Sequence, residues 1–156
     1  MRAAAAGRSL PVMWGRIEGL RVLGLGTPGG LRAELNGLVL SGAKTGTAGL
    51  LEHDYRAEGE ELERAGERLA LVDDDDQPIA VIEVTAVEVV PFGEVTWEFA
   101  DSEGEGYRSV EHWADSHRRF WNSLGHTVDP ATEIVCVSFR LVEPEVLSDA
   151  AQVSRS

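Results

Sequence analysis

A short motif of glycine, lysine and threonine is the part of this sequence best suited to chemistry. It spans residues 42–47 and reads GAKTGT. A lysine amine acts as a base near neutral pH only when burial or a nearby cation lowers its pKa. A threonine hydroxyl attacks a substrate only when a base takes its proton. Lys44 and Thr47 are therefore candidates for nucleophilic catalysis, and Thr45 is the nearest alternative hydroxyl.

The spacing of Lys44 and Thr47 sets a structural requirement. Side chains alternate along an extended chain, so residues three apart point to opposite faces. Gly46 must therefore turn or bulge the chain if the two side chains are to act together. The ordinary alternative is that Lys44 stabilises the carbonyl end of a preceding helix and that Thr47 is a plain strand residue.

Acidic residues around position 103 form a second group of candidates. Glu103 lies in a run of Asp, Ser, Glu and Gly and could protonate a leaving amine or orient Lys44. Glu105 could take the same role, and both could equally belong to a solvated acidic loop. Tyr107 follows two glycines and is the aromatic residue best placed to line a pocket.

A helix is expected immediately before the motif, where it would position Lys44. Thr27 is a good N-cap and Pro28 suits the first helical position. Apolar residues follow at helical spacing, and Gly42 can end the helix.

A β-hairpin is expected next. The apolar runs 69–72 and 79–90 flank a cluster of turn-forming residues at 73–78. Regular alternation in the second run would put Glu83 and Val87 on one face and Val84 on the other.

The clearest helical pattern runs from a Ser109 cap to a Gly125 stop. Its apolar stripe holds large aromatic side chains, which we expect in the core. Arg118 lies on the polar flank, where it could contact phosphate or simply face solvent. With a final strand at 134–142, the order is helix, strand, short helix, hairpin, two helices, strand. This order predicts an α+β fold with a small curled sheet rather than repeated βαβ units.

Two glycine-rich segments resemble phosphate-binding loops. Residues 24–29 match G-x-G-x-x-G, but no βαβ repeat follows, so a glycine-rich helix entry is favoured over a dinucleotide site. Residues 37–45 miss a Walker A motif by one inserted residue, and there the helix precedes the lysine instead of following it. We therefore expect no cofactor.

Metal sites are not expected either. His112 and His117 are five residues apart, which is the wrong spacing for two ligands on one helical face. The acidic run 73–76 lacks the spacing of an EF-hand and is interpreted as a solvated turn.

Charge limits the size of the partner. The 156 residues carry a net charge of −13, but residues 1–44 hold six basic and two acidic side chains. Binding of a long nucleic-acid duplex is therefore not expected, whereas a small positively charged site for a nucleotide or a short single strand is allowed. Cys136 is the sole cysteine, no apolar run is long enough to cross a membrane, and no secretory signal is evident. These features favour a cytoplasmic protein.

The motif at 42–47 resembles that of the ASCH domain, and the resemblance covers about Trp14 to Val142, in the manner of the longer ASCH proteins. The other segments that carry it are 50–55, 67–72, 82–85, 94–100, 103–106, 117–121 and 135–139. It implies a PUA-like small β-barrel with surrounding helices, a mixed and mostly antiparallel sheet, and association with RNA. The domain is expected at 13–144, between flexible segments at 1–12 and 145–156.

The same resemblance implies a chemistry. ASCH proteins include amidohydrolases acting on 4-acetylcytidine and others described as ribonucleases, and in the amidohydrolases a Lys, a Thr and a downstream Glu act together. These positions look like Lys44, Thr47 and Glu103. The candidate substrate-binding residues around them are Gly42, Thr45, Glu105, Tyr107 and Arg118. The expected function is an RNA-related hydrolase acting on a modified nucleoside or short single-stranded RNA; the alternative is a non-catalytic, translation-linked RNA-binding module.

Overall fold

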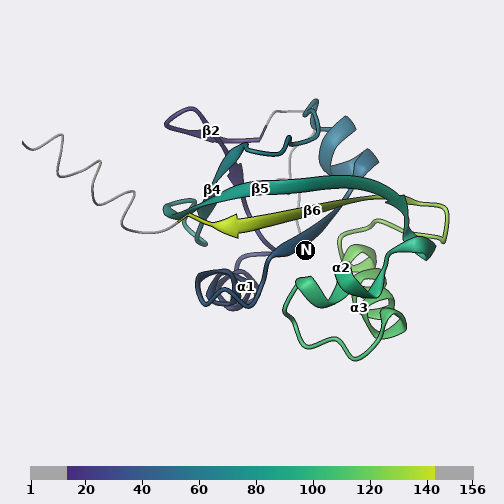
Figure 1. The fold of residues 1–156 in the computed structure, drawn as a ribbon. Helices are drawn as coiled ribbons and strands as arrows, with labels where there is room; N and C mark the ends of the chain where they lie inside the picture. Colours follow the sequence, from purple (N-terminus) through teal and green to yellow (C-terminus); the bar gives the residue numbers. More distant parts are fainter. Residues whose placement is uncertain (1–13, 143–156) are drawn as a thin grey trace, which may run out of the picture.

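The computed structural model describes residues 14–142 (Figure 1). Its helices and strands follow in the order β1 (Arg16–Ile17), β2 (Leu20–Leu23), α1 (Leu31–Leu40), β3 (Gly46–Leu50), a π-helical segment (Leu51–Arg56), β4 (Arg68–Val72), β5 (Pro78–Pro91), a short 3-10 turn (Phe92–Glu94), α2 (Trp97–Ser102), α3 (Val110–Ser123) and β6 (Glu133–Leu141). The terminal segments expected at 1–12 and 145–156 lie outside the described residues. No helix between residues 14 and 142 has the length and apolar character needed to cross a lipid bilayer.

The strands form one six-stranded sheet in the order β1-β2-β4-β5-β6-β3. Only β2 and β4 run parallel; the other four pairs are antiparallel. The α+β prediction and the mostly antiparallel sheet are thus confirmed, but within the described chain the edge strands β1 and β3 do not pair, so the sheet is not a closed barrel. Helix α1 connects β2 to β3, and its Leu35 and Val39 pack into the core that the sheet covers.

The predicted hairpin is confirmed as β4 and β5, but the regular alternation predicted along β5 is wrong. The pairing with β6 shifts between Val84 and Ala86, which is a β-bulge. Because the bulge adds one residue, Val87 returns to the face of Ile82 and Val84. The one-residue shift was not visible in the apolar pattern, since both faces of this strand carry valines.

Helix α1 ends as predicted but starts three residues later than predicted. Gly29 and Gly30 have φ angles of 103° and 121°, and Gly30 is the N-cap. Those angles are not helical, so Thr27 and Pro28 form a turn before the helix rather than its first residues.

Two apolar clusters join the sheet to its helices. The first joins the sheet to α1 and the π-helical segment, and the second joins β3 and β6 to α2 and α3. In Figure 1, α1 lies beneath one end of the long strands β5 and β6, and the α2–α3 pair lies beneath the other. The segment between α1 and β3, which contains Lys44, contacts both the end of α1 and the region at the end of α2.

Candidate functional site

Lys44 is held between the end of α1 and the loop that follows α2. Its backbone N–H donates to the carbonyl of Leu38 at 3.0 Å, which satisfies the last turn of α1. Its side chain is buried, with 1% of the residue's surface exposed. The Nζ atom donates to Oε2 of Glu105 at 2.9 Å and lies 3.4 Å from the carbonyl oxygen of Glu103. The motif lysine and the acidic loop, distant in sequence, are thus brought together.

Lys44 is also the single lysine of the 156-residue sequence; every other basic side chain apart from histidine is an arginine. Lysines are among the side chains least often buried, because an ammonium group loses much solvation energy there. That the sole lysine is buried and ion-paired marks this position as specialised, and the composition alone could have pointed to it.

Two glycines let the acidic loop and α2 approach the motif closely. Gly104 has φ +67°, and a Cβ there would lie 2.2 Å from the carbonyl oxygen of Ala43. A Cβ on Gly46 would lie 2.4 Å from Oγ of Ser102 in α2. The backbone N–H of Thr45 donates to the carbonyl of Ser102 at 2.8 Å. These contacts leave no room for side chains at the two glycines.

Glu103 is fully buried and faces His117 of α3. Its Oε2 lies 3.0 Å from Nε2 of His117, and neither residue's side chain is exposed. Burial opposes ionisation of Glu103, but its electrostatic interactions with His117 and Lys44 outweigh that effect and lower the pKa of the carboxyl group. Glu103 is therefore a carboxylate near neutral pH.

Glu105 links Lys44 to Tyr107. While its Oε2 accepts from Lys44, its Oε1 accepts from the hydroxyl of Tyr107 at 3.0 Å. Burial and the negative charges of Glu105 and Glu103 raise the pKa of Tyr107, so this hydroxyl remains a hydrogen-bond donor. Lys44, Glu103, Glu105, Tyr107 and His117 form what we call the lysine cluster.

Thr47 is buried, and its hydroxyl makes no hydrogen bond to this cluster. The pairing of β3 with β6 continues from Gly46 to Leu50, so the chain does not bulge at Gly46 as cooperation with Lys44 would require. Thr47 lies opposite Val137, which belongs to the first apolar cluster. Its Oγ1 has no hydrogen-bond partner among residues 14–142.

The remaining candidates lie at the surface. Gly42, with φ +84°, ends α1 and is exposed, as is Thr45, whose Oγ1 lies 3.3 Å from the carbonyl of Ser102. Arg118 is exposed on α3, where it pairs with Asp115 at 2.8 Å and lies over the ring of Phe92. Thr45 thus adjoins the lysine cluster, whereas none of the contacts found for Arg118 reaches it.

Sequence reasoning missed the role of His117, which it weighed only as a zinc ligand. A signal was available, because His117 shares the apolar stripe of α3 with Trp113 and Trp121. A buried histidine needs polar partners, and a carboxylate elsewhere in the chain was the natural one to look for.

The side chain of Arg32 fills the space beside the glycine-rich segment 24–29. The guanidinium of Arg32 lies against it, with Nε 2.9 Å from the carbonyl of Leu25 and Nη2 3.4 Å from that of Gly26. A Cβ on Gly24 would lie 3.2 Å from Nη2 of Arg32. The side chain of Arg32 thus fills the space against Gly24, whereas Gly26 has a positive φ angle and lies against Leu31.

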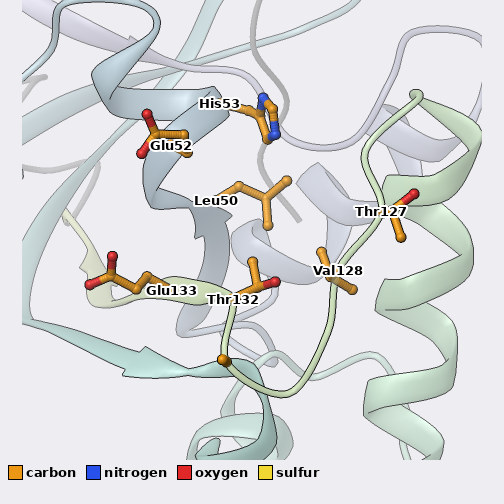
Figure 2. Close-up of a pocket in the computed structure, with 8 residues that line it drawn as sticks. Leu50, Glu52, His53, Thr127, Val128, Thr132 and Glu133 are labelled. Carbon is orange, nitrogen blue, oxygen red and sulfur yellow. The ribbon is translucent and has the colours of Figure 1, made fainter.

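A cavity of about 300 Å³ lies elsewhere on the protein, and the lysine cluster does not line it (Figure 2). Its lining includes Leu50, Glu52, His53 and Glu133. His53 stacks on His126 with ring centroids 3.9 Å apart. In the described part of the chain, no three His, Cys, Asp or Glu side chains are grouped to hold a metal ion.

Comparison with known proteins assigns this architecture. The sequence matches the family described as ASCH domain over residues 25–143. Among solved structures, protein EF3133 from Enterococcus faecalis V583 is 34% identical, with a TM-score of 0.60 over 70% of this chain and 67% of its own. An ASCH domain from Lactobacillus crispatus JV V101 is 30% identical, with a TM-score of 0.60 over 70% of this chain and 71% of its own.

A more distant structure supports the fold alone. The hypothetical protein PH0355 is 16% identical, with a TM-score of 0.51 over 70% of this chain and 92% of its own. Among curated proteins, no sequence matches this chain.

Proposed function

This chain belongs to the ASCH domain family, a PUA-like RNA-binding fold family, and on that basis we propose that it is an RNA-related hydrolase whose site is the lysine cluster. The substrate is a modified nucleoside carrying an amide, of which 4-acetylcytidine is the example, or a short single-stranded RNA. The observation that carries this proposal is the buried amine of Lys44, held on Glu105 beside the ionised carboxylate of Glu103.

Burial of this group is difficult to explain by stability. Taking an ammonium group and two carboxylates out of water costs several kcal/mol per ion before their attraction is counted, and apolar residues of similar volume often serve stability as well (about 1–4 kcal/mol better in some proteins). Perturbed, paired charges of this kind are typical of sites that bind or transform a ligand.

Access to the amine defines a role for Glu105. Because Lys44 has almost no exposed surface, a ligand reaches its Nζ atom only when Glu105 releases it. Glu105 lies between Gly104 and Gly106, which have φ angles of +67° and +81°, and its side chain is 12% exposed. It is therefore the member of the ion pair nearer to solvent.

The charge of the surroundings favours the smaller substrate. The chain carries a net charge of −13, and the lysine cluster contains two carboxylates for one lysine. A nuclease must also hold flanking phosphates, which requires cations beyond Lys44. An uncharged amide on a nucleobase makes no such demand.

Two hydroxyls remain candidates for the nucleophile. Family resemblance implies Thr47, whose buried Oγ1 lacks a hydrogen-bond partner in the described chain. Thr45 is exposed, precedes β3 and adjoins Lys44 in sequence. The variants Thr47→Val and Thr45→Val separate them, because loss of turnover in only one identifies the hydroxyl that reacts.

The test of function compares two substrates and two readouts. Release of acetate from 4-acetylcytidine and cleavage of single-stranded RNA are measured with the full chain, with and without a chelator. We expect acetate release that survives chelation. The variant Lys44→Ala should retain nucleoside binding but lose turnover.

Equal loss of binding and turnover in Lys44→Ala, or RNA binding with no hydrolysis of either substrate by the native protein, would replace the hydrolase with the non-catalytic RNA-binding module. Arg56→Ala is a matched control, since Arg56 is exposed and its ion pairs with Glu52 and Glu133 lie outside the lysine cluster.

A further inference from the structure

His117 has two ring nitrogens that face oxygen atoms on opposite sides. Its Nδ1 lies 2.9 Å from the carbonyl oxygen of Trp113, one turn earlier in α3. Its Nε2 lies 3.0 Å from Oε2 of Glu103. His117 and Glu103 are both fully buried, and at these distances each ring nitrogen is in direct contact with its partner oxygen.

These contacts determine how many protons the pair holds. A backbone carbonyl only accepts hydrogen bonds, so Nδ1 must carry a proton. A neutral imidazole with its proton on Nδ1 would then present a lone pair at Nε2 to a carboxylate oxygen, and two acceptors would face each other at 3.0 Å. The two atoms are not aligned as a hydrogen bond, so the contact becomes attractive only as an ion pair, which requires one further proton on the pair.

The surroundings of the ring favour placing that proton on His117. The imidazole stacks on Trp113 with centroids 4.1 Å apart, and it meets the ring of Trp121 edge-on at 5.3 Å. The ring of Tyr107 lies 5.6 Å away. The negative face of an aromatic ring attracts a cation, and this attraction is larger in a site from which water is excluded.

We propose that His117 is a positioning residue that remains doubly protonated in the folded protein and holds Glu103 as a carboxylate beside Lys44. The other titratable groups that act on Glu103 are consistent with this charge distribution. Lys44 adds a second positive charge, whereas Tyr107 and Cys136 are neutral near pH 7. Glu105 is paired with Lys44, so the cluster carries two cations and two carboxylates.

This assignment decides between the two roles considered for Glu103. A carboxyl group that His117 keeps ionised does not protonate a leaving amine in the resting state; its negative charge attracts the ammonium group of Lys44 instead. This consequence rests on the proposed function, whereas the protonation of His117 does not depend on any substrate.

The first test uses the native protein without substrate. The sequence has four histidines, and the ¹⁵N spectrum of their rings distinguishes singly from doubly protonated imidazoles. We expect His117 to show two protonated nitrogens at pH 8, and exposed His112 of the same helix gives the comparison signal. A neutral His117 at pH 7 in the folded protein would overturn the proposal, whatever the enzymatic activity.

The second test uses Glu103→Gln and His117→Gln. In Glu103→Gln, His117 should lose its second proton by pH 8, and an unchanged spectrum would contradict the proposed pair. In His117→Gln, the proposal predicts that kcat on 4-acetylcytidine falls about tenfold or more with little change in KM. It also predicts that the acidic limb of the pH–rate profile moves to higher pH, because Glu103 loses the charge that lowers its pKa.

Unchanged kcat and an unchanged pH profile in folded His117→Gln would remove the positioning role. His112→Gln is the matched control, since His112 lies on the exposed side of α3. If the native protein proves inactive while its His117 is doubly protonated, the proposed function fails and the protonation assignment stands.

Discussion

Lys44 and Glu105 are 61 positions apart in the sequence, yet their side chains form an ion pair 2.9 Å long. The pair depends on two placements. Helix α1 must end just before Lys44, and the loop after α2 must pass directly over the backbone at Ala43, where Gly104 makes the approach possible. The fold thereby brings an amine and a carboxylate together where little water reaches them.

Replacement of Gly104 by alanine should destabilise the protein and disturb the lysine cluster. An alanine there would adopt φ +67° and place its Cβ 2.2 Å from a backbone oxygen. The two effects together should lower the free energy of unfolding by about 2 kcal/mol or more, measured by chemical denaturation. Gly106→Ala is the control, because φ is +81° but no atom lies within 4 Å of its Cβ, so about 1 kcal/mol is expected. Equal losses in both variants would refute the close approach at Gly104.

The contact between β3 and α2 can be tested at Gly46. Gly46→Ala should cost about 1–3 kcal/mol of unfolding free energy, because its Cβ would lie 2.4 Å from Oγ of Ser102. Ser102→Ala removes that oxygen, so the double variant should recover part of the loss. Strictly additive effects would show that Gly46 and Ser102 are not in contact.

The exposed glycine in the middle of α1 gives the opposite prediction. Gly37→Ala should stabilise the protein by about 0.5–1 kcal/mol, because no atom lies within 4 Å of a Cβ at this position.

The stacked histidines next to the cavity predict a pH dependence. Partial burial and the charge of His53 lower the pKa of His126 below its usual 6.5. A lowered histidine pKa means that the folded state binds the proton less well than the unfolded state. The contribution of neutral His126 to the free energy of unfolding is therefore complete above about pH 6.5, and it is lost as the pH falls below that value. The difference in unfolding free energy between native protein and His126→Gln should shrink from pH 7.5 to 5.5; a constant difference would contradict the coupling.

Cys136 should react slowly in the folded protein. Burial, together with the negative charges of Glu103 and Glu88, raises the pKa of its thiol to about 12. Almost no thiolate is present near pH 7, and the thiolate is the species that alkylating reagents attack. Because Cys136 is the sole cysteine, the rate of labelling by iodoacetamide should follow unfolding. Rapid labelling under native conditions, at the rate of a free thiol, would contradict the buried environment.

Local patterns predicted much of the fold because they depend on neighbouring residues. At the start of α3, the side chain of Ser109 accepts the expected hydrogen bond from the backbone N–H of His112, and the acidic turn between β4 and β5 closes the expected hairpin. The two-residue strand β1 and the parallel pairing of β2 with β4 were not predicted. Such features depend on contacts between strands that are distant in sequence, and segments this short are too brief to show an alternation of apolar and polar residues.

The site was also predicted only in part. The motif and the acidic loop were identified from residue types, and the structure joins them through Lys44 and Glu105. The contact between Glu103 and His117 was missed because it joins a loop to a helix through side chains alone. The orientation of Thr47 followed from strand alternation, and the structure shows no bulge at Gly46 that would change it.

The most direct test of the account observes the amine of Lys44 itself. Because the sequence contains one lysine, protein labelled with ¹⁵N-lysine gives a single side-chain ammonium signal. In the free protein, we expect this signal to exchange slowly with water, as an ion-paired and buried ammonium does. Addition of 4-acetylcytidine should shift it, with uridine as the control. A signal that already exchanges freely with water, or one that remains unmoved while 4-acetylcytidine is bound or hydrolysed, would contradict the central claim that Lys44 is the functional group of this site.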